Sequence, residues 1–209
     1  NIGKPALEIL PRLSTSTFVI LELSSFQLQD LKQSPQIAVV LDVFPDHLDA
    51  HKNLQEYFDA KTNIAKWQKE SDKIFYFRDN KYSKWISQKS RGKKIPVSAK
   101  NSRLFKPEEL KMPGQHNFKN AVMAANVALS LGCPKEKIIK VVKKFHGNEH
   151  RLELIRAIRI NPSYPYKSVF IKFYNDSAST NPQTAVAAIR AFKEPKILIA
   201  GGKDKGLNY

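Results

Sequence analysis

Short apolar runs, rich in β-branched and aromatic residues, alternate with segments of helical periodicity, and this alternation restricts the fold more than any other feature. Strands are indicated at 17–23, 36–43, 73–77, 94–99, 168–174 and 196–202, with an alternating strand, antiparallel or at a sheet edge, at 151–160. Helices are indicated at 53–69, 79–90, 117–132, 134–145 and 181–192. Because a strand–helix–strand order with short loops requires crossover connections, the sequence predicts an α/β fold with a mostly parallel sheet.

The strand–helix pattern restarts after residues 145–151, which indicates a domain boundary. We expect one domain over 1–147 and a second over 148–209. The chain starts at Asn1 and ends shortly after a glycine pair, so we also expect it to be a piece of a longer protein. Its residues hold no GxxxxGK[ST] sequence, so if the protein is an ATP enzyme, its phosphate loop is expected in a missing amino-terminal part.

The chain is strongly basic, with 35 Lys+Arg against 19 Asp+Glu and a net charge of +16. Aromatic residues do not interleave with the lysines in an RNA-binding pattern, so solvated helix faces explain the charge better than a nucleic-acid groove. Cys133 is the only cysteine, which excludes an internal disulfide, and no apolar run reaches 18 residues. We expect neither a nucleic acid nor a membrane as a partner.

Glu22 stands out because it lies inside the otherwise apolar run 17–23. Burying a carboxylate is costly unless it is paired or bound to a metal. Glu22 is therefore either a metal ligand or a carboxylate at the edge of burial, hydrogen-bonded to Ser24 or Ser25. The spacing favours neither interpretation.

Polar residues also follow the strand 36–43, at the strand end where ligands bind in parallel sheets. His47 and His51 are four residues apart, as in a zinc pair on a helix, but the proline-containing loop gives no secure helix, so zinc is a minor alternative. Lys61 lies midway along the helix 53–69, where an exposed lysine is the simplest interpretation.

Two later loops have the composition of a nucleotide or anion site. Asp176 follows the strand 168–174 and is suited to hold a ribose hydroxyl. The glycine pair and lysines of 201–206 follow the last strand, where such a loop can approach an anion closely. The glycine pair alone is weak evidence.

Taken together, the loops resemble those of the Mur ligases. The segments that carry the resemblance, in the order of that family, are NIGKPAL at 1–7, LELSSFQL at 21–28, FPDHLDAH at 44–51, YFDAK at 57–61, GQHNFKNAVMAA at 114–125, HRLE at 150–153, NDSASTNP at 175–182 and GGKDKG at 201–206. The opening NIGKP and ELSSFQL are most similar to the members that add D-glutamate. The resemblance implies a central ATP-binding domain with a sheet of the P-loop-NTPase type, lacking its phosphate loop, and then the start of a Rossmann-like domain.

The resemblance further implies an ATP-dependent amide ligase of peptidoglycan precursor synthesis. ATP would phosphorylate the L-alanine carboxylate of UDP-N-acetylmuramoyl-L-alanine, and the amine of D-glutamate would displace phosphate from the acyl phosphate. These groups are anionic, so Mg²⁺ and lysines are expected to neutralise their charge. We expect the enzyme to be cytoplasmic and monomeric, and this piece of it to be inactive alone.

The resemblance also assigns roles to single residues. Glu22, His47 and Lys61 match the magnesium site and are the expected catalytic residues; Lys61 matches a carbamylated lysine, and a carbamate is a carboxylate-like ligand. The expected nucleotide-binding residues are Asn117, Asn120, Arg151 and Asp176. The muramoyl substrate is expected at Asn1, Ser24 and Gln27, and D-glutamate at Thr180 and Lys205.

One position departs from the family. Ala178 stands where the family pattern NDSKATN has a lysine, which removes one cation from the D-glutamate side. Two alternatives stay open. One is a sister Mur ligase or a folylpolyglutamate-type ligase with another amino acid substrate, and the other is a non-catalytic basic binding domain.

Overall fold

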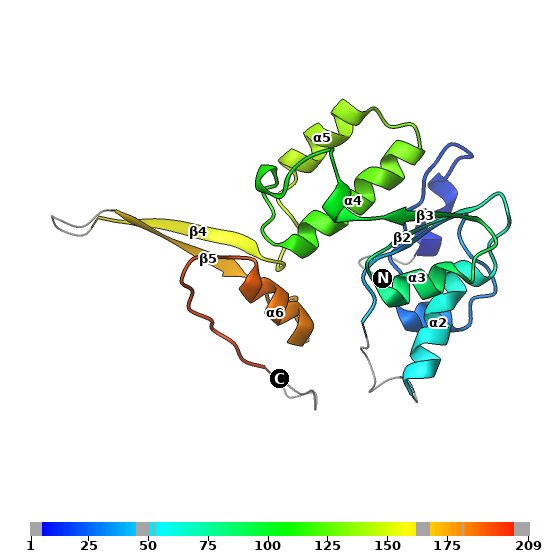
Figure 1. The fold of residues 1–209 in the computed structure, drawn as a ribbon, viewed down its shortest axis with the longest axis horizontal. Coiled ribbons are helices and arrows are strands. Elements are labelled where there is room, and N and C mark those ends of the chain that lie inside the picture. The colour runs from blue at the N-terminus through cyan, green and yellow to red at the C-terminus, as the bar shows by residue number, and fades with distance from the viewer. Residues whose placement is uncertain (1–5, 45–50, 52, 162–167, 181, 203–209) are drawn as a thin grey trace. The chain divides into compact units, whose positions relative to one another are not determined.

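The computed structural model describes residues 6–44, 51, 53–161, 168–180 and 182–202. The chain forms two compact units, unit 1 over residues 1–97 and unit 2 over residues 98–209, and each is described by itself (Figure 1). The boundary expected between 147 and 148 refers to domains of a longer protein and stays a prediction.

Unit 1 is built on a parallel sheet of three strands in the order β1 (Ile37–Val40), β2 (Lys73–Phe77) and β3 (Lys93–Val97). Helix α2 (Leu54–Lys66) connects β1 to β2, and α3 (Lys81–Ser87) connects β2 to β3 (Figure 1). The expected parallel α/β arrangement of this part of the chain is therefore confirmed.

The core of unit 1 lies between the sheet and these two helices. Ala38 and Ile74 from the sheet are fully buried, as are Ala65 in the last turn of α2 and Ile86 in α3. Phe75 and Phe77 on β2 are buried as well. Because side chains alternate along a strand, these two lie on the face opposite Ile74, so the central strand is covered on both faces. Each fully buried large side chain contributes about 1.5–3 kcal/mol to folding.

Asparagines start both helices. The Asn53 side chain accepts a hydrogen bond from the Glu56 N–H at 2.9 Å, so Asn53 is the N-cap of α2. Asn80 caps α3 by accepting from the Ser83 N–H at 2.8 Å, and it donates to the carbonyl of Val43, beyond β1, at 3.1 Å.

Gln68, just after α2, joins the starts of all three strands. Its buried amide donates to the carbonyl of Pro35 at 2.8 Å and to that of Lys73 at 2.9 Å. Its oxygen accepts from the Ser90 hydroxyl at 2.7 Å. Because Pro35, Lys73 and Ser90 precede or begin β1, β2 and β3, one side chain fixes the amino-terminal edge of the sheet.

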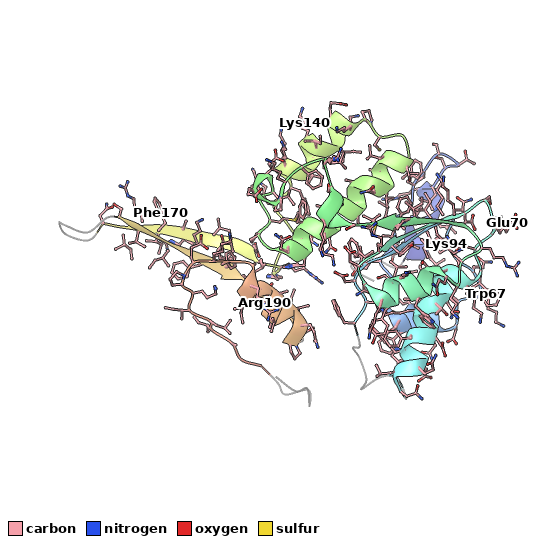
Figure 2. All side chains as sticks on the ribbon, in the orientation of Figure 1. Trp67, Glu70, Lys94, Lys140, Phe170 and Arg190 are labelled. Atoms are coloured by element: carbon pink, nitrogen blue, oxygen red, sulfur yellow. The ribbon has the colours of Figure 1, made fainter. Side chains whose placement is uncertain are left out.

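Unit 2 begins with two short 3₁₀ helices, η2 (Ala99–Asn101) and η3 (Pro107–Glu109), followed by α4 (Gln115–Ser130) and α5 (Lys135–Lys144). Strands β4 (Glu153–Ile160) and β5 (Val169–Asn175) then form an antiparallel pair, and α6 (Pro182–Arg190) follows. Phe170 on β5 and Lys140 on α5 are both exposed (Figure 2).

Two expected strands are absent, and four short helices of the described chain were not expected. Residues 17–23 and 196–202 are extended without strand pairing, and none of the described strands forms a ladder with them. Their apolar side chains are correspondingly exposed, at 94% for Ile20 and 95% for Ile197. The unexpected elements are the 3₁₀ helix η1 (Ala6–Arg12), the single-turn helix α1 (Ser25–Gln29) and the short 3₁₀ helices η2 and η3.

Candidate functional site

Helix α1 presents two of the expected substrate residues. Ser24 is its N-cap: the Ser24 Oγ accepts from the Gln27 N–H at 3.3 Å, and the Gln27 Oε1 accepts from the Ser24 N–H at 3.0 Å. This reciprocal capping box satisfies two backbone donors and fixes both side chains. Glu22 precedes it in an exposed, irregular stretch of chain.

Lys61 lies on α2 and is partly buried. Its Nζ is 4.9 Å from the centre of the Tyr57 ring, over the ring face, which is a cation–π contact. The Tyr57 hydroxyl donates to the carbonyl of Phe44 at 2.9 Å. The lysine is thus held at the side of α2 that adjoins the chain leaving the carboxyl end of β1.

His51 connects α1 with α2. Its Nε2 is 2.9 Å from the Ser25 Oγ, its ring is stacked on Phe26 at 4.8 Å, and it meets the Tyr57 ring edge-on at 5.4 Å. The side chain is 4% exposed. The zinc pairing of His51 with His47 stays untested, because His47 lies outside the described residues.

The expected metal residues can be followed only in part. Glu22 and Lys61 are described, whereas His47 lies outside the described residues. Across the described ranges no three His, Cys, Asp or Glu side chains gather closely enough to hold a metal ion. The convergence of Glu22, His47 and Lys61 on one metal therefore stays a prediction.

In unit 2 the structure brings together a cluster of charged residues at the start of α4. Burial lowers the pKa of His116 below its ordinary value of 6.5; the charge of Asp176 raises this pKa, and that of Arg151 lowers it. The next residue, Asn117, donates to the carbonyl of Pro113 at 2.7 Å. Arg151, Asp176 and Asn117 were expected to bind nucleotide; His116 was missed, although it directly precedes Asn117.

Asp176 organises the turn that carries Arg151. Its Oδ1 accepts from the Leu152 N–H at 3.0 Å, and its Oδ2 accepts from the Ser179 hydroxyl. His150 and Leu152 both have positive φ, at 63° and 48°, a conformation that costs about 1 kcal/mol or more in a residue other than glycine. The Asp176 carboxylate therefore holds a strained turn in place.

The remaining expected site residues are less defined. Asn120 is exposed on α4, one turn after Asn117, and Thr180 is exposed before α6. Asn1 and Lys205 lie outside the described residues. Ala178 donates its N–H to the carbonyl of His150 at 3.0 Å, so it contacts the same strained turn.

Residues 6–104 match the family model described as the Mur ligase middle domain. This part of the chain belongs to the Mur ligase family. The predicted resemblance to the Mur ligases is confirmed for it, as is the α/β fold with a parallel sheet. The P-loop-NTPase type of the sheet and the Rossmann-like nature of the second domain stay predictions.

Curated relatives extend the similarity beyond the Mur ligase middle domain. UDP-N-acetylmuramoylalanine–D-glutamate ligases of Ruminiclostridium cellulolyticum and Clostridium tetani are 38% and 35% identical to this chain, over 100% of it. The chain spans 47% of each, about half the length of these relatives.

Solved Mur ligase structures resemble the fold. A crystal structure of MurF from Acinetobacter baumannii has a TM-score of 0.59 at 18% identity, covering 80% of this chain and 39% of that protein. A UDP-N-acetylmuramoylalanyl-D-glutamyl-2,6-diaminopimelate–D-alanyl-D-alanyl ligase from the same organism has a TM-score of 0.55 at 19% identity, covering 76% of this chain and 37% of that protein.

None of the helices in the described part of the chain is long and apolar enough to cross a bilayer.

Proposed function

We propose that the protein containing this chain is an ATP-dependent amide ligase that adds D-glutamate to UDP-N-acetylmuramoyl-L-alanine in peptidoglycan precursor synthesis. The observation that carries the proposal is the 38% identity, along the entire chain, to a relative named for that activity. The reaction proceeds through an acyl phosphate of the L-alanine carboxylate, and the amine of D-glutamate displaces phosphate to form the amide. The enzyme acts as a cytoplasmic monomer.

In this proposal unit 1 supplies the metal and muramoyl sites. Glu22, His47 and Lys61 hold Mg²⁺, which neutralises phosphate charge when bound. The described donors fit a hard cation in part: Glu22 is a carboxylate on an exposed residue, whereas the Lys61 ammonium becomes a ligand only as a carbamate. Ser24 and Gln27, fixed by their capping box, contact the muramoyl substrate together with Asn1.

Unit 2 supplies the nucleotide contacts. Asn117 and Asn120 project from neighbouring turns of α4, and Arg151 provides a cation for the phosphates. Asp176 holds the turn of Arg151 through the Leu152 N–H, which supports a positioning role in addition to a ribose contact. Thr180 and Lys205 receive D-glutamate.

The proposal is tested by a ligation assay of the complete protein. With ATP, Mg²⁺ and UDP-N-acetylmuramoyl-L-alanine present, we expect ADP release and amide formation with D-glutamate and not with other amino acids. Efficient ligation of a different amino acid would identify a sister ligase. Absence of ligation, combined with salt-dependent nucleic-acid binding, would indicate the basic binding domain instead.

Two substitutions test the metal site within the same assay. Glu22→Ala and Lys61→Ala each remove an expected ligand, so kcat should fall by about two orders of magnitude or more. Lys66→Ala is the matched control, because Lys66 is an exposed lysine at the end of the same helix. Near-normal turnover of both site variants would remove the metal assignment.

A further inference from the structure

We propose that His51 is a positioning residue for the muramoyl substrate: it sets the location of the α1 cap relative to Lys61. This inference rests on the proposed function. It concerns a residue that the proposed mechanism does not use, and it starts from the contacts of one buried imidazole.

The first contact joins His51 to the substrate-binding cap. Ser25, whose hydroxyl is 2.9 Å from the His51 Nε2, is the first residue of α1 and is 2% exposed. It lies directly between Ser24 and the rest of the capping box. A shift of the Ser25 hydroxyl therefore moves Ser24 and Gln27 with it.

The second contact joins His51 to the lysine. The His51 and Tyr57 rings pack in a T-shaped arrangement with their centres 5.4 Å apart, and the Lys61 Nζ lies over the Tyr57 ring, 4.9 Å from its centre. The chain of contacts thus runs from Ser24 through Ser25, His51 and Tyr57 to Lys61. It links residues proposed to bind the muramoyl group with a residue proposed to hold the metal.

Packing alone does not explain a histidine here. The His51 Nδ1 is buried and has no hydrogen-bond partner among the residues that the structure describes. An unpaired buried polar atom destabilises the fold by about 1–3 kcal/mol, and phenylalanine would make the same two ring contacts without it. What phenylalanine cannot provide is the hydrogen bond to Ser25.

Two substitutions in the complete enzyme separate the bond from the packing. His51→Phe keeps a flat ring but removes the bond, so the KM for UDP-N-acetylmuramoyl-L-alanine should rise about tenfold while the KM for ATP changes less than about twofold. His51→Gln replaces the ring but offers an amide that can reach Ser25, and it should restore most of the affinity. Equilibrium urea unfolding checks that both variants are folded.

Ser25→Ala is an independent test of the same hydrogen bond. It removes the other partner of the same bond, so its effect on KM should match that of His51→Phe, and the double variant should be no worse than either single one. Additive effects of the two substitutions on KM would contradict the inference. So would an unchanged KM for the muramoyl substrate in His51→Phe, whether or not the urea midpoint falls.

The two levels of the proposal fail differently. A complete wild-type protein that ligates no amino acid to UDP-N-acetylmuramoyl-L-alanine removes the proposed function and this inference together. A competent wild-type enzyme with normal His51→Phe kinetics removes only the positioning role.

Discussion

At the scale of single residues, His116 links the stability of unit 2 to pH. Burial holds its pKa below 6.5, with opposing effects from Asp176 and Arg151. A histidine with a depressed folded-state pKa stays neutral while the unfolded chain takes up a proton. Its contribution to stability is therefore complete above pH 6.5 and is lost as pH falls from 6.5 toward the lower folded-state value.

We expect the urea midpoint of the wild-type protein to fall between pH 7.5 and 5.5, and this fall to be smaller in His116→Gln. NMR titration of the His116 ring should give a midpoint below 6.5. A ring that titrates at or above this value would contradict the burial inferred for it.

Which site residues could be found from the sequence depends on how local their contacts are. The Asn53 cap was predictable, because its partner Glu56 is three residues away. The bond between His51 and Ser25 spans 26 residues, and no spacing rule relates them. His116 was equally hidden, since Arg151 and Asp176 reach it only through the fold of unit 2.

At the scale of elements, the sheet of unit 1 depends on Gln68. Gln68→Leu removes three hydrogen bonds in a buried place, so the Ser90 hydroxyl loses its acceptor and the Pro35 and Lys73 carbonyls lose the donor that Gln68 supplies. We expect a loss of about 3 kcal/mol or more in the free energy of unfolding, measured with urea. Gln88→Leu, at an exposed glutamine, is the control and should change it by less than about 0.5 kcal/mol. Equal losses in both variants would refute the role of the buried amide.

The helices and most strands were predictable because their periodicity and caps are local. For example, the strand expected at 73–77 is found with the same bounds, and the helix expected at 117–132 is α4. The expected strands 17–23 and 196–202 failed for one reason: an apolar run becomes a strand only where a neighbouring strand supplies its hydrogen bonds. Helix α1 was missed because its single turn is shorter than any periodic signal.

At the scale of the whole molecule, the chain lacks the sequence motif with which P-loop proteins bind the phosphates of ATP. The 209 residues contain no GxxxxGK[ST] sequence, whose backbone N–H groups cradle phosphates in P-loop proteins. We therefore expect this chain alone to release no ADP above background when supplied with ATP, Mg²⁺ and both proposed substrates. A coupled ADP assay, run beside the complete protein as the positive control, measures this. Turnover by the isolated chain would mean that its residues hold a phosphate site of another kind.

The position of Gln68 in the sequence has a consequence for the order of folding events. Its amide can reach Pro35 only after a loop of 33 residues has closed, and Ser90 only after a second loop of 22. We therefore expect these contacts to form after the local turns of helix, on the native side of the rate-limiting barrier. In that case the stabilisation that Gln68 provides acts mainly on the unfolding rate, and its loss should shorten the lifetime of the native sheet more than it slows assembly.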